Sequence, residues 1–151
     1  MASQNTEVYD IQNGTPATYP GDSGASSRIA SKHVGGEDYV VNIAYTTTSA
    51  VTAGSQVINL FQLPVGAKVN SLEVIVPASV GTSSAKIGIT GDDDRYGSAK
   101  DLSSAGRVQF ITAAADAEYV TTQNENVFLS PVTVNFATAI RFQVICKFTV
   151  G

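Results

Sequence analysis

From residue 38 onward, apolar and polar residues alternate along several short segments. The final segment, "AIRFQVICKFTV", alternates most regularly, with apolar side chains at Phe142, Val144, Cys146, Phe148 and Val150. Successive side chains of a strand point to opposite faces of a sheet, so this pattern predicts a strand with one buried face. Cys146 falls on the apolar face, which favours a small core residue over a reactive nucleophile.

Six other segments show alternation or short apolar runs between turn residues: "DYVVNIAYTTT", "SQVINLFQL", "KVNSLEVIVP", "AKIGIT", "RVQFIT" and "ENVFLSPVTVNF". The last contains Pro131, which predicts an edge strand or two separate strands. Only "GSAKDLSSAG" and "TAAADAEYV" could form a helical turn. Many short strands separated by turns predict an all-β fold, an antiparallel β-sandwich or jelly-roll-like domain.

Residues 1–37 are different, because no apolar period survives there for more than a few residues. The segment is rich in Gly, Ser, Thr, Asn and Pro, and cannot bury enough apolar surface alone to offset its ordering entropy. We therefore predict an extended N-terminal arm over residues 1–37 and a β-sandwich domain over residues 38–151. The alternative is an unstructured leader. If the arm orders against a partner, its scattered apolar residues are the candidate anchors: Val8, Tyr9, Ile11, Tyr19 and Ile29.

Composition excludes several classes of protein. The 151 residues suit one domain, and 43% are hydrophobic, so a core can form. Lys and Arg total nine, form no run and leave a net charge of −4, which argues against nucleic acid as a partner. A single cysteine excludes a disulfide framework or a cysteine-based zinc site. No signal-peptide or membrane-span pattern is seen, so we expect no membrane partner.

The segment "ITGDDDRYGSA" holds three consecutive aspartates in a chain poor in charge. A calcium loop would need acidic or amide groups at alternate positions, but Tyr96 and Ser103 occupy two of the ligand positions counted from Asp92. We therefore interpret Asp92, Asp94, Arg95 and Tyr96 as a structural loop, in which Arg95 pairs with a neighbouring carboxylate. A bound cation remains the alternative.

The catalytic interpretation of these aspartates is weaker. Three adjacent acids cannot straddle a scissile bond alone, and the sequence gives no sign that Glu73, Asp116 or Glu118 completes a pair. His33, the only histidine, lies in the arm, and no nucleophile, metalloprotease, P-loop or dinucleotide motif is present. We expect no enzymatic activity, no metal, no cofactor and no small-molecule substrate.

Three stretches together, "NLFQLPVGAKVNSLEVIVP", "AKIGITGDDDRYGSA" and "IRFQVICKFTV", resemble the capsid decoration proteins of tailed bacteriophages, also called cement or head-stabilising proteins. The resemblance covers about residues 40–150 and rests on the turn from Leu63 to Val69 and on Asp94, Arg95 and Tyr96. It implies a β-sandwich that binds the outer surface of the capsid and stabilises it. The implied partner is the major capsid protein, and the implied location is the virion surface after synthesis in the host cytoplasm. Decoration proteins and exposed sheet edges both favour a homo-oligomer, a dimer or trimer.

Two other functions stay open. A phage head-fibre, tail or adhesin module that binds a host glycan has a similar β-rich composition. A carbohydrate-active enzyme would use the aspartates as acids, so alanine at Asp92 and Asp94 would then abolish turnover.

Overall fold

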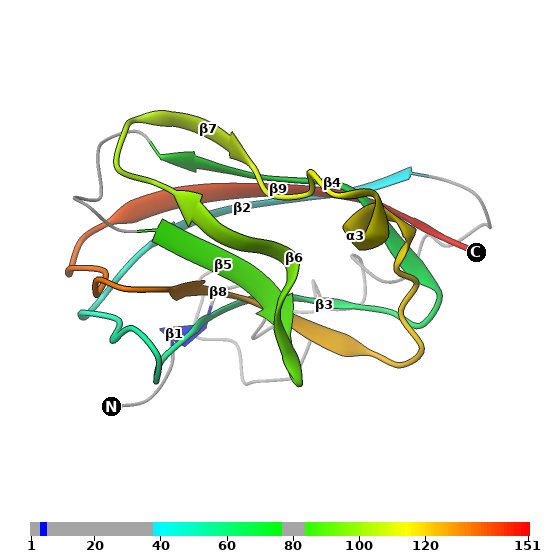
Figure 1. Ribbon diagram of the computed structural model, residues 1–151, viewed down its shortest axis with the longest axis horizontal. Helices are drawn as coiled ribbons and strands as arrows, with labels where there is room; N and C mark the ends of the chain where they lie inside the picture. Colours follow the sequence, from blue (N-terminus) through cyan, green and yellow to red (C-terminus); the bar gives the residue numbers. More distant parts are fainter. Residues whose placement is uncertain (1–3, 6–37, 77–83) are drawn as a thin grey trace, which may run out of the picture.

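The computed structural model describes residues 4–5, 38–76 and 84–151, and all structural statements below concern these residues. They form two sheets that pack face to face (Figure 1). The elements are β1 (Gln4–Asn5), β2 (Asp38–Thr46), β3 (Ile58–Leu63), β4 (Ala67–Val76), β5 (Ser84–Ile89), β6 (Asp92–Asp101), β7 (Gly106–Gln109), α3 (Ala114–Glu118), β8 (Glu125–Pro131) and β9 (Arg141–Val150).

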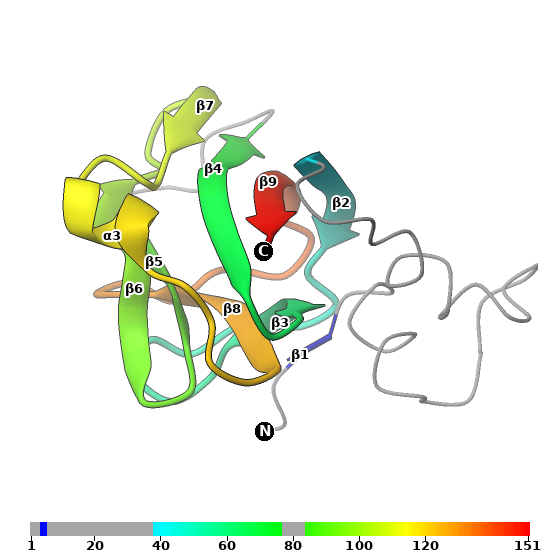
Figure 2. The same cartoon turned by 90° about the vertical axis from the view of Figure 1, so that its right-hand side faces the viewer.

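One sheet has the strand order β2-β9-β4-β7, and the other has the order β3-β8-β5-β6 with the short β1 added beside β3. All pairings are antiparallel except the parallel pair β1–β3. Consecutive strands pass repeatedly from one sheet to the other, as in a double-sheet jelly roll. The predicted all-β, antiparallel sandwich is confirmed. Viewed end on, the two sheets form separate layers (Figure 2).

The core lies between the sheets and follows the alternation in the sequence. In β9, Phe142, Val144, Cys146 and Phe148 are all at most 3% exposed, while Arg141 and Lys147 face solvent. The opposite sheet contributes large side chains such as Phe61 from β3, which is also fully buried. Each such burial contributes about 1.5–3 kcal/mol, so the facing apolar rows hold the two layers together.

Two segments differ from the sequence prediction. "ENVFLSPVTVNF" contains one strand, β8, which lies inside its sheet between β3 and β5, and the last residue of the segment, Phe136, forms an isolated bridge with Val51. Pro131 is tolerated because it is the last residue of β8, and the next donor along the chain, the N–H of Val132, still bonds to Ser84 O at 3.0 Å. "GSAKDLSSAG" forms no helix, since β6 extends through it to Asp101. "TAAADAEYV" does contain a helical turn, α3, which lies against β4 and β6.

The N-terminal segment is described only at Gln4 and Asn5, which form β1. Residues 1–3 and 6–37 lie outside the described residues, and so do residues 77–83. The division into an arm of residues 1–37 and a domain of residues 38–151 stays a prediction. No helix in the described part of the chain is long and apolar enough to cross a membrane.

Candidate functional site

The "ITGDDDRYGSA" segment forms the end of β5, the turn after it and most of β6. Gly91 has a φ of +90° in this turn, a conformation that favours glycine. Asp92 pairs with Ile89, and Gly97 pairs with Ile87. Between these two pairings β6 therefore contains several more residues than β5. This is a large β-bulge, a device that changes the direction of side chains.

The bulge corrects one sequence interpretation. We expected Asp92, Asp94, Arg95 and Tyr96 in a loop, but all four belong to strand β6. The local sequence does not predict a strand here, because aspartate has a low β-propensity. Only the pairing with β5 places these residues in a strand.

The aspartates are engaged with basic side chains. Asp92 forms an ion pair with Arg95, and Asp93 Oδ2 lies 2.5 Å from Lys86 Nζ. Asp94 is exposed. Partly exposed pairs of this kind contribute little stability, about 0–1 kcal/mol each. Among the described residues, no three His, Cys, Asp or Glu side chains gather in a way that could hold a metal ion.

Tyr96 points from the bulge into the protein interior, where it is 1% exposed. Its ring meets the edge of Tyr119 with 6.3 Å between centroids, and the Arg95 guanidinium lies 4.4 Å from the Tyr119 ring centroid. The Tyr119 hydroxyl donates a hydrogen bond of 2.5 Å to Glu125 Oε1. Glu125 is itself only 6% exposed, so the cluster ties the bulge to the start of β8.

This cluster shifts the ionisation of both tyrosines. Burial, reinforced by the charge of Glu125, raises the pKa of Tyr96 well above its ordinary value. The hydrogen bond with Glu125 raises the pKa of Tyr119. Both phenols are therefore held in their neutral form, which suits a structural role and not proton transfer near neutral pH.

The other candidate acids do not join the aspartates. Glu73 lies on the opposite sheet, where Oε1 is 2.6 Å from Arg107 Nη1. Asp116 and Glu118 lie on α3. Cys146 is buried, and burial raises the pKa of its thiol, so it has neither access nor thiolate character.

Gln4 anchors the start of the chain, which no sequence pattern indicated. Its backbone N–H donates to Val57 O at 3.1 Å, so β1 extends the sheet beyond β3. Its side-chain Oε1 accepts from the Tyr45 hydroxyl at 2.5 Å and from the Thr48 N–H at 3.0 Å. Its Nε2 donates to Ser49 O at 2.9 Å. One side chain thus joins the N-terminal strand to β2 and to the connection that follows it.

The candidate anchors Val8, Tyr9, Ile11, Tyr19 and Ile29 lie outside the described residues. Their role in binding a partner stays a prediction. His33 is outside them as well.

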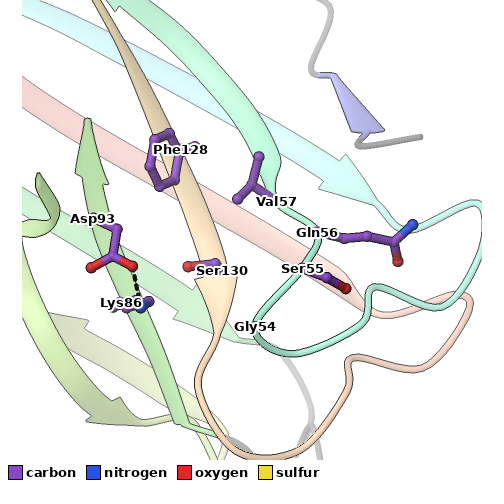
Figure 3. Close-up of a pocket in the computed structure, with 8 residues that line it drawn as sticks. All are labelled: Gly54, Ser55, Gln56, Val57, Lys86, Asp93, Phe128 and Ser130. Atoms are coloured by element: carbon purple, nitrogen blue, oxygen red, sulfur yellow. Dashed lines mark hydrogen bonds and ion pairs between the residues drawn. The ribbon is translucent and has the colours of Figure 1, made fainter. Parts of the chain in front are cut away.

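A further feature that the sequence did not indicate is a hollow on the outer face of the β3-β8-β5-β6 sheet (Figure 3). It is about 220 Å³ in volume. Its walls come from the segment before β3 and from β5, β6 and β8; they are Gly54, Ser55, Gln56, Val57, Lys86, Asp93, Phe128 and Ser130. Residues 54–57, residues 86–93 and residues 128–130 are far apart from one another in sequence, so only the fold brings these three parts together.

Comparison with known proteins gives matches in structure alone. No family model matches the chain, and no curated protein matches it. A chain from the capsid of Ralstonia phage GP4 has a similar fold, with a TM-score of 0.63 and 17% identity over 78% of this chain and 87% of that one.

Two other phage capsids contain similar chains. In the acidic stable capsid structure of Helicobacter pylori bacteriophage KHP30, the match has a TM-score of 0.55 and 18% identity over 78% of this chain and 90% of that one. In the cyanophage Pam1 capsid asymmetric unit, it has a TM-score of 0.57 and 19% identity over 88% of this chain and 100% of that one. At these identities the likeness establishes a shared fold.

Proposed function

We propose that this chain is a structural protein of a bacteriophage virion that binds the outer surface of the capsid and stabilises it, as decoration or cement proteins do. The observation that carries the proposal is the match to chains of three phage capsids, which extends over 87–100% of those chains. The likeness therefore concerns nearly the whole of each capsid chain and not a common β-sheet fragment. The partner is the major capsid protein.

The mechanism follows from mass action. A protein that binds the assembled shell more tightly than free subunits shifts the equilibrium toward the shell. Many copies with modest individual contacts together resist disruption, as multivalent attachment does. This mechanism needs no enzymatic activity.

The N-terminal arm supplies the contact with the capsid or with neighbouring subunits in this proposal. β1 fastens one end of the arm beside β3, and the other end continues into β2 at Asp38. β1 and β2 are the outermost strands of the two layers on one side of the sandwich, where Gln4 bonds to Tyr45 of β2.

The described edges of β2 and β7 have no neighbouring strand in their sheet, which supports self-association as a dimer or trimer. Sedimentation of the purified protein would measure this state directly.

Binding to shells that lack the protein tests the proposal. Wild type should sediment with the shells and raise their melting temperature. A full-length variant with Val8, Tyr9, Ile11, Tyr19 and Ile29 changed to serine should bind at least about 100-fold more weakly, since aromatic and aliphatic anchors contribute on the order of 1 kcal/mol or more each.

The matched control changes Val40 and Val134 to serine, because both are exposed apolar side chains of the sandwich itself. This control should bind as wild type does. If wild type does not bind shells, the decoration function is wrong. If the arm variant binds as well as wild type, the capsid contact lies elsewhere in the chain.

A further inference from the structure

The hollow in Figure 3 has an aromatic floor. Phe128 is half-buried on the outer face of β8, where it pairs across the sheet with Gly88 of β5 and Asn59 of β3. Gly88 has no side chain, and the backbone of Asp92 and Asp93 at the start of β6 occupies the space above it. Val57 lies on the other side of the ring, so the floor and one wall are apolar.

A buried hydroxyl lies beside this floor. Ser130 is only 4% exposed, although it points to the outer face of the sheet, and its Oγ has no hydrogen-bond partner among the described residues. A buried polar atom without a partner costs about 1–3 kcal/mol, so a ligand that bonds to it gains a specific advantage. Ser130 lines the hollow, so this unused hydroxyl lies in its wall.

The opposite wall is charged but locally neutral. Lys86 Nζ and Asp93 Oδ2 lie 2.5 Å apart at the rim, so an ammonium donor and a carboxylate acceptor stand side by side (Figure 3). Their charges offset each other, which favours a neutral ligand with its own donors and acceptors over an ion. The side chains stay partly exposed, at 26% for Lys86 and 59% for Asp93, and can reach a bound molecule.

We propose that this hollow binds one neutral sugar unit of a glycan. The C–H face of a pyranose ring is apolar and would pack on Phe128, while its hydroxyls would bond to Ser130, Lys86 and Asp93. The size agrees, since pockets for drug-sized ligands measure roughly 300–1,000 Å³ and this one is smaller, about 220 Å³. This goes beyond capsid attachment and gives the protein a second binding activity.

A peptide is the less suitable occupant. An extended peptide binds by adding a strand to an open sheet edge, whereas Phe128 and Ser130 lie on β8, inside the sheet. The segment Gly54–Val57 and the start of β6 limit the hollow on two sides, which suits a compact ring.

A broad glycan array probed with the full-length protein is the first test. The sugar unit of the strongest hit is then titrated into ¹⁵N-labelled protein, with millimolar galactose, rhamnose and N-acetylglucosamine as fixed comparisons. Amide signals of Lys86, Asp93, Phe128 and Ser130 should shift in a saturable way. Signals of β9 on the opposite sheet should not move.

Two variants assign the binding to this hollow. Phe128→Leu keeps an apolar side chain but removes the ring, and should weaken sugar binding about tenfold. Ser130→Ala removes the hydroxyl and should weaken it about fivefold. Ile145→Leu is the matched control, because Ile145 is also half-buried and lies on the outer face of the other sheet. It should bind sugar as wild type does.

The proposal is overturned if no glycan binds, or if Phe128→Leu and Ser130→Ala both bind sugar as wild type does while remaining folded. It is also overturned if peptides of the capsid protein shift these amides and sugars do not. All three variants should still bind shells fully. A variant that loses sugar binding but still binds shells separates this activity from the decoration function. A variant that loses shell binding but still binds sugar separates them equally well.

Discussion

The side-chain oxygen of Gln4 accepts a 2.5 Å hydrogen bond from the hydroxyl of Tyr45, across 41 positions of sequence. The same oxygen accepts from the Thr48 N–H at 3.0 Å. Since β1 has only two residues, these side-chain bonds add to the single backbone bond from Gln4 to Val57 that holds β1 against the sandwich.

Replacing Gln4 with alanine should release the Thr48 amide. A neutral hydrogen bond is worth about 1 kcal/mol, so hydrogen exchange at Thr48 should accelerate about fivefold. Exchange measured by NMR tests this directly. Gln62→Ala is the control, because Gln62 donates to Asn126 at 3.1 Å on the outer face of the sheet. Unchanged exchange at Thr48 in Gln4→Ala would show that the backbone pairing suffices.

Gly88 should not tolerate a side chain. A Cβ atom there would lie 2.2 Å from the carbonyl carbon of Asp93 and 2.4 Å from Asp92 O, because the start of β6 crosses over it. Gly88→Ala should therefore cost about 3 kcal/mol in the free energy of unfolding, measured by urea denaturation.

Gly54→Ala is the informative comparison for Gly88. Gly54 has a φ of +79° and open space around it, so alanine adds only conformational strain, about 1–2 kcal/mol. If Gly54→Ala lowers the free energy of unfolding as much as Gly88→Ala or more, then β6 moves aside in Gly88→Ala at little energetic cost.

Tyr96 and Tyr119 should respond oppositely to loss of the hydroxyl group. The Tyr96 hydroxyl is buried with no hydrogen-bond partner among the described residues, so Tyr96→Phe should be neutral or stabilise the fold by up to about 1 kcal/mol. Tyr119→Phe should destabilise it by about 1–2 kcal/mol, because Glu125 would lose the hydrogen bond to Oε1 while its Oε2 already has none in the described structure. Thermal unfolding of both variants checks the sign, and destabilisation by Tyr96→Phe would reveal a partner for its hydroxyl.

Alkaline pH should weaken the fold through Tyr96. Burial raises the pKa of Tyr96 above its ordinary value of 10.0. The folded state then holds the phenol proton of Tyr96 more tightly than the unfolded state does. The contribution of this proton to the free energy of unfolding is therefore fully present below the ordinary pKa and is lost as the pH rises above it. Urea denaturation of wild type and Tyr96→Phe between about pH 8 and pH 11 measures this. The wild type should lose stability relative to Tyr96→Phe only above about pH 10, and parallel curves would contradict the prediction.

Alternation along the chain was enough to predict the sandwich, and the reason is physical. In β9 and β2 one face is buried against the other sheet, so nearly every second side chain must be apolar. The alternation alone therefore assigns Phe142, Val144, Cys146 and Phe148 to the core, where all four are buried.

The candidate sites could not be predicted in the same way. Tyr96 enters the core through a bulge, and a bulge breaks the period that would have indicated it. Glu125 is buried because Tyr119 reaches it, although an acidic residue at a strand start suggests exposure. The hollow joins residues 54–57 to β5, β6 and β8, and local sequence carries no information about such long-range neighbours.

The two described ends of the chain have a practical consequence for engineering. Gln4 is hydrogen-bonded to Val57, just before β3 begins, whereas the N–H of Gly151 donates to Gly66 O just after β3 ends. β3 has six residues at about 3.3 Å each, so the two ends are held roughly 20 Å apart, near opposite ends of β3. Peptides or fluorophores attached at these two positions would therefore be well separated. Energy transfer between a donor and an acceptor placed there would report whether β1 stays paired with β3.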